Sequence, residues 1–353
     1  MRMALRLAAQ AAGRTHPNTM VGALVVRSGR IVGRGFHRRA GAPHAEVQAL
    51  RQAGRFSRNA ALYVTLEPCK HFGRTPPCTH AIVKSGIRRV VAAMIDPNPK
   101  MKGRSFRWLR SQGIRTSVGI LKEESMRLNK AFVTRVTKKR PFVTVKVAQS
   151  LDGKIATKTG QSQWISSPEA RRWTHHLRSQ VDAILVGVET ILKDDPRLTV
   201  RLGVRKQPMK VVLDSRLRTP PKARIFNSHA PVLIATTKTA PRKREEMLCQ
   251  VGAHVLRLPS RDGRVDLKGL LRELARREVT HLLVEGGGQV IASAFATRAV
   301  DRVAFIVAPL VIGGKEAPTA VEGSGIRCLQ KAFRLKNITC ERLGPDLLVT
   351  ADV

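Results

Sequence analysis

The feature that most constrains this chain is a set of three metal-binding side chains between residues 44 and 78. His44 is followed by Glu46, Glu67-Pro68 directly precedes Cys69, and eight residues separate Cys69 from Cys78. One imidazole and two thiolates are good ligands for Zn²⁺ and leave its fourth tetrahedral position to water. A carboxylate two residues after the histidine can shuttle protons for that water without binding the metal. The pattern predicts a zinc site with ligands His44, Cys69 and Cys78, and with Glu46 as the proton shuttle.

The spacing of the two cysteines narrows the substrate. Deaminases that act on nucleic-acid bases usually have only two residues at this place. The eight residues found here are Lys70-His71-Phe72-Gly73-Arg74-Thr75-Pro76-Pro77. Their basic and hydroxyl side chains are suited to binding a phosphate. A small phosphorylated substrate is therefore favoured over a nucleic acid.

Together these residues resemble the deaminase half of the bifunctional riboflavin-biosynthesis deaminase/reductases. Asn18, Val21-Gly22 and the run Asp96-Pro97-Asn98-Pro99 fit the same family. The chain departs from the family at Thr19, where Pro is usual, and at Lys70, where Ser or Asn is usual. Neither departure removes a ligand or the proton shuttle, so both bear on substrate fit.

The resemblance implies which side chains of this half contact the substrate, with the last three near its phosphate. They are Asn18, His37, His71, Arg74 and Thr75.

Length and composition set the frame for these motifs. A chain of 353 residues, 42% of them hydrophobic, is long enough for two domains with separate cores. No apolar run approaches the roughly 20 residues of a membrane helix. Two of the five cysteines are assigned to metal, and the remaining three, Cys249, Cys328 and Cys340, are widely spaced. An odd remainder argues against a disulfide framework, so we predict a cytoplasmic protein without a membrane partner.

The charge balance is unusual: 64 Lys and Arg face 25 Asp and Glu, a formal net charge of +39. Such a chain attracts polyanions. The basic residues are scattered through both halves, however, and one Tyr and three Trp supply few stacking platforms for single strands. We interpret the charge as a compositional bias that suits phosphorylated substrates. It predicts RNA adsorption at low salt but no specific nucleic-acid partner.

Periodicity predicts an alternating α/β layer in the amino-terminal half. Helices are expected over residues 3–12, 44–53, 79–84, 103–111 and 122–136, and strands over residues 21–26, 31–36, 62–66, 88–93 and 114–118. Cys78 then lies at or just before a helix start, where a thiolate is stabilised. The layer matches the cytidine-deaminase-like, three-layer fold that the resemblance implies.

The charged segment Lys138-Lys139-Arg140-Pro141 ends the last of these helices, because a helix stops before proline. We predict a zinc-dependent pyrimidine deaminase domain over residues 1–138 and a second domain over residues 141–353. In that second half, strands are expected over residues 142–148, 183–188, 210–214, 232–236, 254–258, 281–284, 303–308, 333–342 and 346–351. Helices are expected from Ser166-Ser167-Pro168-Glu169 to 178, over 266–277, and from the glycines at 286–288 to 295.

The second half resembles the reductase domain of the same enzymes, whose fold is like dihydrofolate reductase. The resemblance rests on residues 146–154, Ser162-Gln163-Trp164-Ile165, Asp194-Asp195-Pro196 and Glu285-Gly286-Gly287. It implies that NADPH lies near Ala148, Trp164, Thr190, Asp194, Ser215, Gly287, Gly288, Gln289, Val290, Ile291, Ala292 and Ser293. It implies that the phosphosugar substrate lies near Ser162, Arg178, Leu198, Arg201 and Glu285.

Chemistry supports part of this second site. A planar guanidinium such as that of Arg178 or Arg201 can clamp a phosphate through two parallel hydrogen bonds. The strand that ends at Glu285 leads through three glycines into a helix, and unpaired N–H groups at a helix start favour anions. G-x-G-x-x-G is absent, so the dinucleotide-binding fingerprint of Rossmann folds is not present. The spacing leaves two candidates for a proton donor, Lys146 and Asp152.

These observations predict a two-domain enzyme of riboflavin synthesis that uses zinc in the first domain and NADPH in the second. The first step would deaminate 2,5-diamino-6-ribosylamino-4(3H)-pyrimidinone 5′-phosphate, and the second would reduce the opened ribose of the product to a ribityl chain. Family resemblance further implies a homo-oligomer that associates through the reductase half. Two alternatives stay open: a deaminase of nucleic-acid bases with an appended binding domain, and a monofunctional deaminase whose reductase half is degenerate.

Overall fold

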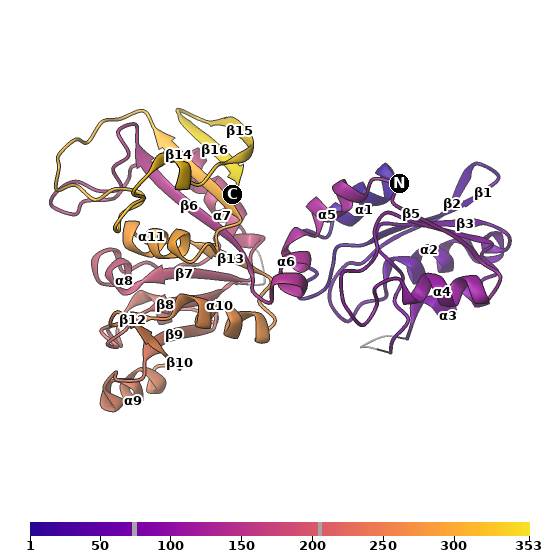
Figure 1. Cartoon of the computed structure of the whole chain (residues 1–353), viewed down its shortest axis with the longest axis horizontal. Coiled ribbons are helices and arrows are strands. Elements are labelled where there is room, and N and C mark those ends of the chain that lie inside the picture. Colours follow the sequence, from indigo (N-terminus) through magenta and orange to yellow (C-terminus); the bar gives the residue numbers. More distant parts are fainter. Residues whose placement is uncertain (73–75, 204–206) are drawn as a thin grey trace. The chain divides into compact units, whose positions relative to one another are not determined.

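The computed structural model describes residues 1–72, 76–203 and 207–353 and divides the chain into two compact units. The first unit is Met1–Arg140 and the second is Pro141–Val353. Figure 1 labels their helices and strands. Each unit has its own sheet with helices on its faces, so the predicted α/β class is confirmed.

The first unit is built on a five-stranded sheet in the order β2-β1-β3-β4-β5. Its strands are β1 (Gly22–Arg27), β2 (Arg30–Phe36), β3 (Ala61–Val64), β4 (Arg89–Ala92) and β5 (Arg115–Val118). β1 pairs antiparallel with β2 and β3, whereas β3, β4 and β5 are parallel. The chain therefore leaves β3 and β4 at the same edge of the sheet, and Cys69 and Asp96 follow these two strands.

Six α-helices of the described chain belong to this unit: α1 (Arg2–Ala9), α2 (Ala45–Ala53), α3 (Cys78–Lys84), α4 (Arg104–Ser111), α5 (Lys122–Leu128) and α6 (Lys130–Lys138), with a 3₁₀ turn at Gly54–Ser57. Helices α1 and α5 lie on one face of the sheet, and α2, α3 and α4 lie on the other (Figure 1). Apolar side chains such as Leu62 and Val90 fill the space between the layers.

Glycines in β2 set how closely α2 approaches the sheet. A Cβ atom at Gly33 would lie 2.1 Å from the carbonyl oxygen of Ala49, and one at Gly35 would lie 2.2 Å from that of Ala45. Any side chain at either position would force the helix away. This contact places the first turn of α2, which carries Glu46, directly over the strand.

One helix was expected over residues 122–136, and that expectation is wrong. The helix is interrupted at Asn129, whose backbone departs from helical values with φ −106° and ψ 21°. The Asn129 side chain is buried, accepts a hydrogen bond from Met20 N at 2.8 Å and donates one to Met20 O at 2.9 Å. An amide that satisfies a distant backbone segment competes with helix continuation, and α5 and α6 are the result.

The second unit has a nine-stranded sheet in the order β10-β9-β8-β7-β13-β6-β14-β16-β15. The strands are β6 (Phe142–Ser150), β7 (Ala183–Gly187), β8 (Met209–Leu213), β9 (Val232–Thr237), β10 (Ala253–Leu258), β13 (His281–Val284), β14 (Arg302–Ala308), β15 (Lys336–Leu343) and β16 (Asp346–Asp352). All are parallel except β15 and β16, which form an antiparallel hairpin along β14. A small separate hairpin joins β11 (Ser260–Arg261) to β12 (Arg264–Val265).

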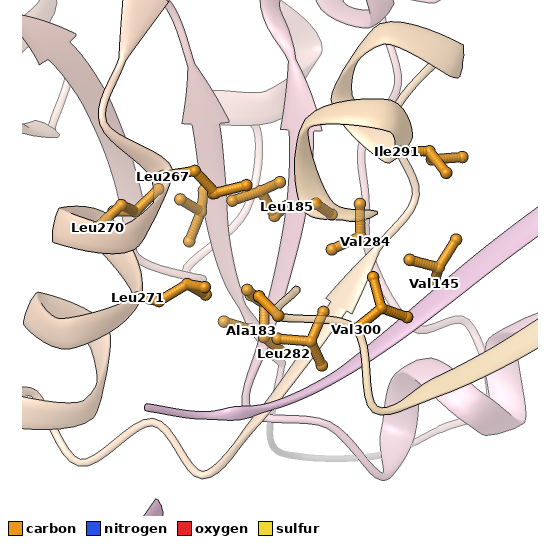
Figure 2. Packing of buried hydrophobic residues seen from close by; sticks show 14 of the residues in the cluster. Val145, Ala183, Leu185, Leu267, Leu270, Leu271, Leu282, Val284, Ile291 and Val300 are labelled. Carbon is orange, nitrogen blue, oxygen red and sulfur yellow. The ribbon is translucent and has the colours of Figure 1, made fainter. Parts of the chain in front are cut away.

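Helices cover both faces of this sheet: α7 (Pro168–Ser179), α8 (Val188–Asp194), α9 (Arg242–Gln250), α10 (Leu267–Arg276) and α11 (Gly288–Ala296). Alternate residues of β7 divide between two cores, Leu185 facing α10 and α11 and Ile184 facing the other layer. Figure 2 shows the first core, where leucines of α10 and Ile291 of α11 meet the strands. Full burial of one such side chain contributes about 1.5–3 kcal/mol.

Several features of the second unit were not foreseen. Helices α8 and α9 and the β11–β12 hairpin stand where no element was expected, and the strand expected from residue 333 begins at Lys336. α9 reads Arg-Lys-Arg-Glu-Glu-Met-Leu-Cys-Gln and buries only Leu248, so it has almost no apolar stripe to reveal it. In the described residues, no helix combines the length and apolar character that crossing a membrane requires.

Candidate metal centre and reductase site

Three elements bring His44, Cys69 and Cys78 together in the first unit. His44 is the N-cap residue of α2, Cys69 lies in the loop after β3, and Cys78 is the first residue of α3. The Nδ1 atom of His44 lies 3.1 Å from Cys78 Sγ and 3.5 Å from Cys69 Sγ. All three ligand atoms lie within 4.8 Å of one another. The three residues that the sequence assigned to a metal therefore form one cluster.

The cluster fits zinc. Bond lengths of about 2.0 Å to nitrogen and 2.3 Å to sulfur around a tetrahedral ion place neighbouring ligand atoms roughly 3.5–3.8 Å apart. The two distances from His44 Nδ1 are close to that value, so the ligands need to move little. Cys78 is fully buried, as expected for a ligand that is not exposed to solvent.

Hydrogen bonds prepare the thiols for a metal. The backbone N–H of Cys78 donates to Cys69 Sγ at 3.2 Å. The Cys78 thiol and His44 add to this bond and lower the pKa of Cys69 to about 4, although burial acts in the opposite direction. The pKa of Cys78 is raised because its thiol donates to Cys69 and is buried near negative charge. Of the two thiols, Cys78 is therefore the one that keeps its proton, and metal binding would release that proton.

Glu46 lies in the first turn of α2, beside the cluster, and its side chain is buried. Burial and the neighbouring charge of Cys69 raise its pKa to about 7, while His44 acts in the opposite direction. A carboxyl group with such a pKa can both accept and release a proton near neutral pH. This is the property that a proton shuttle needs.

Two residues expected to contact substrate lie against the cluster. The Asn18 side-chain amide and His37 Nε2 are 3.1 Å apart, and the His37 ring packs edge-on against His44 with centroids 5.2 Å apart. Burial, followed by the charge of His44, lowers the pKa of His37. A neutral imidazole is therefore favoured at this position.

The other substrate residues of this half lie in the segment between the cysteines. His71 is exposed, and its Nδ1 atom lies 3.3 Å from Met101 Sδ. Arg74 and Thr75 lie outside the described residues.

Asp96 was not named as a site residue, yet it lies near the cluster. Its pKa is raised to about 6 by burial and by the negative charges of Glu67 and Cys69, against the hydrogen bond from Asn98. The only sequence signal was the Asp-Pro-Asn-Pro turn, which does not reveal that the strand before it ends beside Cys69.

In the second unit, a half-buried charge cluster joins Lys146, Arg178 and Glu285. Lys146 lies in β6, and Glu285 directly follows the neighbouring parallel strand β13, where Val284 pairs with Val145. Arg178, in α7, donates from Nε to Glu285 Oε1 at 2.9 Å and from Nη2 to Oε2 at 2.5 Å. Two of the donors expected to clamp a phosphate are therefore bound to Glu285.

The cluster shifts the ionisation of its members. Burial alone would raise the pKa of Glu285, but the charge and hydrogen bonds of Arg178, together with Lys146, lower it overall. Burial lowers the pKa of Lys146, and the charge of Glu285 only partly opposes this. Lys146 is therefore the more easily deprotonated of the two cations.

His175 also belongs to this cluster, and no sequence motif pointed to it. It lies one turn before Arg178 in α7, and Arg201 N donates to its Nδ1 at 3.4 Å. Burial, Arg178 and Arg201 lower its pKa, so the neutral ring is favoured. A histidine in a chain with ten of them is not distinctive until the fold places it between two arginines.

The remaining reductase residues gather at the carboxyl edge of the parallel strands. Ala148 lies near the end of β6, Thr190 in α8 after β7, and Ser215 after β8. Ser162 donates to Asp194 Oδ1 at 3.0 Å. Ligands of open α/β sheets bind at this edge.

The residues at this edge differ in their exposure to solvent. Trp164 is 64% exposed with the Arg171 guanidinium 4.6 Å from its ring centroid, whereas Leu198 is buried. Gly287 is the N-cap of α11, and residues 288–293 form the first turns of that helix.

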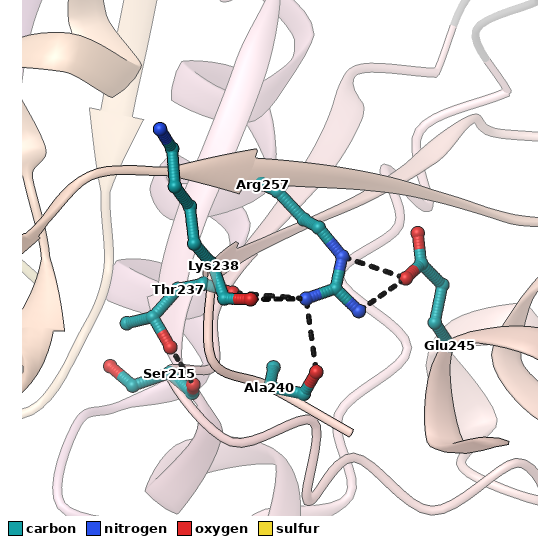
Figure 3. Close-up of polar contacts among 6 residues, drawn as sticks. All are labelled: Ser215, Thr237, Lys238, Ala240, Glu245 and Arg257. Carbon is teal, nitrogen blue, oxygen red and sulfur yellow. Dashed lines mark hydrogen bonds and ion pairs between the residues drawn. The ribbon is translucent and has the colours of Figure 1, made fainter. Parts of the chain in front are cut away.

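The backbone of Ser215 is held by a side chain of the neighbouring strand β9. Thr237 Oγ1 donates to its carbonyl oxygen at 2.8 Å, and Arg257 fixes the turn that follows Thr237 through the carbonyls of Lys238 and Ala240. Figure 3 shows Arg257 between this turn and Glu245 of α9. The unforeseen helix α9 thus supports the loop expected to bind the cofactor.

Comparison with known proteins decides the family. Residues 141–349 match the RibD C-terminal domain family, and residues 1–94 match the cytidine and deoxycytidylate deaminase zinc-binding region. The riboflavin biosynthesis protein RibD of Aquifex aeolicus is 46% identical over 351 residues, covering 99% of this chain and 96% of that protein. The chain belongs to the RibD family.

Solved structures agree with this assignment. Acinetobacter baumannii RibD superposes with a TM-score of 0.89 at 33% identity, covering 99% of this chain and 97% of that one. The Thermotoga maritima diaminohydroxyphosphoribosylaminopyrimidine deaminase/5-amino-6-(5-phosphoribosylamino)uracil reductase superposes with a TM-score of 0.86 at 36% identity, covering 100% of this chain and 97% of that one. The predicted deaminase-like and dihydrofolate-reductase-like folds are confirmed.

Membership in the RibD family settles the general function. The protein is a bifunctional deaminase and reductase of riboflavin biosynthesis that acts on small pyrimidine intermediates. Its deaminase half has a zinc site at His44, Cys69 and Cys78, and its reductase half depends on NAD(P)H. Both predicted cofactor classes are confirmed, and neither alternative function is supported.

Proposed function

We propose that the first unit deaminates 2,5-diamino-6-ribosylamino-4(3H)-pyrimidinone 5′-phosphate and that the second unit reduces 5-amino-6-(5-phosphoribosylamino)uracil with NADPH. The observation that carries this proposal is the buried Glu46 carboxyl group beside the cluster of His44, Cys69 and Cys78. The two activities named for the Thermotoga maritima relative are the source of the substrates. We assign the deaminase to residues 1–138 and the reductase to residues 141–353.

In the deaminase, zinc held by the three ligands would supply a Lewis acid that lowers the pKa of water at its open position. Glu46 would take one proton from the attacking water and deliver it to the ring nitrogen, and would then pass the second proton of that water to the amino group, which departs as ammonia while the carbonyl forms. Asn18 and His37 would orient the pyrimidine, since they are hydrogen-bonded to each other next to His44. His71, Arg74 and Thr75 would bind the phosphate.

In the reductase, NADPH would supply the hydride that reduces the opened ribose. Of the two candidate proton donors, Lys146 is favoured because it is half-buried near the carboxylate of Glu285. Asp152 is unsuitable because hydrogen bonds from Ser150 and from the backbone of Ile312 and Gly313 lower its pKa to about 2. A carboxylate with that pKa carries no proton at neutral pH.

The remaining assignments place substrate and cofactor around Lys146. The phosphosugar would contact Ser162, Arg178, Leu198, Arg201 and Glu285. NADPH would lie along Ala148, Trp164, Thr190, Asp194, Ser215 and residues 287–293, where the backbone N–H groups at the N-terminus of α11 would face a phosphate. To bind the substrate phosphate, Arg178 would have to release Glu285 or turn its Nη1 atom away from Thr199 O, to which it donates at 3.4 Å.

We also propose a cytoplasmic homo-oligomer that forms through the reductase unit. The edge strand β15 is exposed along nearly its whole length, and its Ile338 is 63% exposed. An exposed edge with apolar side chains is a natural pairing site. Sedimentation of the wild type and of Ile338→Lys tests this part, since a monomeric wild type would exclude it.

The test of the main proposal measures zinc content, ammonia release and NADPH oxidation on one preparation. Wild-type protein should release ammonia from the diaminopyrimidine phosphate and oxidise NADPH only with the deaminated product. Glu46→Gln should keep its zinc and its NADPH oxidation but lose ammonia release by about 10²–10⁴-fold. Undiminished deamination by this variant would contradict the role of Glu46.

A further inference from the structure

Glu67 is a buried acid of the Glu-Pro-Cys motif for which the mechanism has no use. Only 3% of its surface is exposed. It follows β3, as Asp96 follows the neighbouring parallel strand β4, and its own N–H donates to Met94 O at 3.0 Å. Two residues beyond it lies the ligand Cys69. Glu67 therefore links the loop that carries Cys69 to the segment that follows β4.

The carboxylate of Glu67 accepts three backbone hydrogen bonds. Asp96 N donates to Oε2 at 3.1 Å, Gly103 N donates to the same oxygen at 2.8 Å, and Ser105 N donates to Oε1 at 3.0 Å. Gly103 is the N-cap of α4, and Ser105 lies in its first turn. An anion at a helix N-terminus is stabilised by the unpaired N–H groups and by the helix dipole.

These bonds fix a segment that faces the metal cluster. The segment from Asp96 to Ser105 contains Asp96, whose ionisation already responds to Cys69 and His71, and Met101, which contacts His71. Asn98 folds the segment on itself, because its N–H donates to Asp96 Oδ1 at 2.8 Å and its carbonyl accepts from Met101 N at 2.8 Å. Glu67 is the only acid among the described residues that holds both ends of this fold to the loop of Cys69.

We propose that Glu67 is a positioning residue of the deaminase: it holds residues 96–105 against the Cys69 loop and so fixes both a zinc ligand and one wall of the pyrimidine site. This rests on the proposed deaminase function. Groups that orient metal ligands typically change metal affinity or activity by about 10–100-fold when they are replaced. A merely structural carboxylate would change stability alone.

Glu67→Gln is the sharpest variant, because it keeps the size of the side chain but turns one acceptor into a donor. At least one of the three backbone N–H groups then faces an N–H₂ group and loses its bond. We expect the dissociation constant for zinc to rise by about 10–100-fold. At saturating zinc, KM for the pyrimidine phosphate should rise by about tenfold while kcat changes little, since Glu46 is untouched.

A matched control is Asp214→Asn in the second unit. Asp214 is also fully buried and accepts three hydrogen bonds, from Thr219 N at 2.7 Å, from Thr219 Oγ1 at 2.8 Å and from Arg216 N at 3.4 Å. This variant should lower thermal stability without changing zinc affinity or the KM of deamination. It therefore separates a general cost of losing a buried carboxylate from a positioning effect.

Amide hydrogen exchange supplies a readout that is independent of activity. In Glu67→Gln the N–H groups of Asp96, Gly103 and Ser105 should exchange faster than in the wild type. In wild-type protein, removal of zinc with a chelator should speed exchange at the same three amides, because the carboxylate couples them to the Cys69 loop. The wild-type measurement remains decisive if Glu67→Gln does not fold.

The outcomes divide cleanly. A folded Glu67→Gln with wild-type zinc affinity and wild-type KM would overturn the inference, as would unchanged exchange at these amides after zinc removal. Zinc affinity and exchange do not depend on the identity of the substrate. Absence of ammonia release from the wild type would therefore refute the proposed substrate while leaving the role of Glu67 open to these two measurements.

Discussion

The two active regions of this protein are assembled from very different lengths of chain. The metal centre takes all its ligands and its proton shuttle from residues 44–78, and its ligand atoms lie within 4.8 Å of one another. The reductase cluster joins Lys146, Arg178 and Glu285, which come from three elements spread over 140 positions. A compact motif can be recognised residue by residue, whereas a dispersed cluster becomes visible only when strands β6 and β13 are paired.

The two regions also differ in their charged groups. The first is a site of soft ligands and one buried acid whose pKa is raised to about 7 by burial and the charge of Cys69. The second is a buried ion pair with an additional cation, in which Arg178 lowers the pKa of Glu285 against the effect of burial. The first region binds an external cation, whereas the second pairs its carboxylate with a cation of the chain itself. The following predictions test that distinction.

The largest effect is expected from removing a metal ligand. Cys69→Ala should lose stoichiometric zinc and lower ammonia release by about 10⁴-fold, or roughly 5.5 kcal/mol. NADPH oxidation with the deaminated product should stay close to wild type, because the second unit has its own core. Metal analysis and the two assays on one sample measure this. Loss of both activities would show that the regions are not independent.

A slightly smaller loss is expected when the extra cation of the reductase cluster is removed. Lys146→Met keeps the volume of the side chain but removes the proposed proton donor, so reduction should fall by about 10²–10³-fold. Ammonia release and zinc content should not change. Steady-state NADPH oxidation, with NADPH binding measured separately by fluorescence, tests the prediction. If this variant reduced the substrate at the wild-type rate, Lys146 would not be the proton donor.

The sequence predicted the first region better than the second, and the reason is physical. His44, Glu46, Cys69 and Cys78 have few alternative uses at that spacing, so residue types alone carried the chemistry. Arg178 is one of 64 basic residues, and nothing local shows that its guanidinium binds Glu285 107 positions away. Long-range pairing of this kind is a property of strand order.

The elements that were missed have related causes. Helix α9 lacks an apolar stripe, and the break at Asn129 depends on a side chain that reaches Met20 across 109 positions. Glu67 was quoted as part of a motif, but its three backbone partners lie 29 to 38 residues further on. At Asn129 and Glu67 the deciding contact is a tertiary hydrogen bond that local periodicity does not encode.

A third prediction concerns the packing that positions Glu46. Gly35→Ala would place a methyl group 2.2 Å from Ala45 O, and the helix backbone cannot give way without moving the first turn of α2. We expect deamination to fall by about tenfold while reduction is unchanged. Gly22→Ala is the control, because its Cβ would clash with Ala4 O of α1, on the other face of the sheet. Equal losses of deamination in both variants would indicate general destabilisation.

The smallest effect is expected at Lys210, a buried cation in β8 that lies outside both regions. Its Nζ donates to Ile225 O and to Ser228 Oγ, and burial lowers its pKa from 10.5 to about 8. Between about pH 8 and pH 10.5 the unfolded chain therefore binds more protons at this group than the folded chain. The free energy of unfolding should rise with pH across that window, by roughly 1–3 kcal/mol.

Lys210→Met tests whether the buried charge of Lys210 affects only the stability of the second unit or also its reductase activity. The variant should lose the rise in unfolding free energy between pH 8 and pH 10.5, measured by urea denaturation at several pH values. Its pH profile of NADPH oxidation should match that of the wild type, since Lys146 and not Lys210 adjoins Glu285. A shifted pH profile of NADPH oxidation in Lys210→Met would mean that the charge of Lys210 influences the ionisation of the reductase cluster. Lys210 would then act on catalysis as well as on stability.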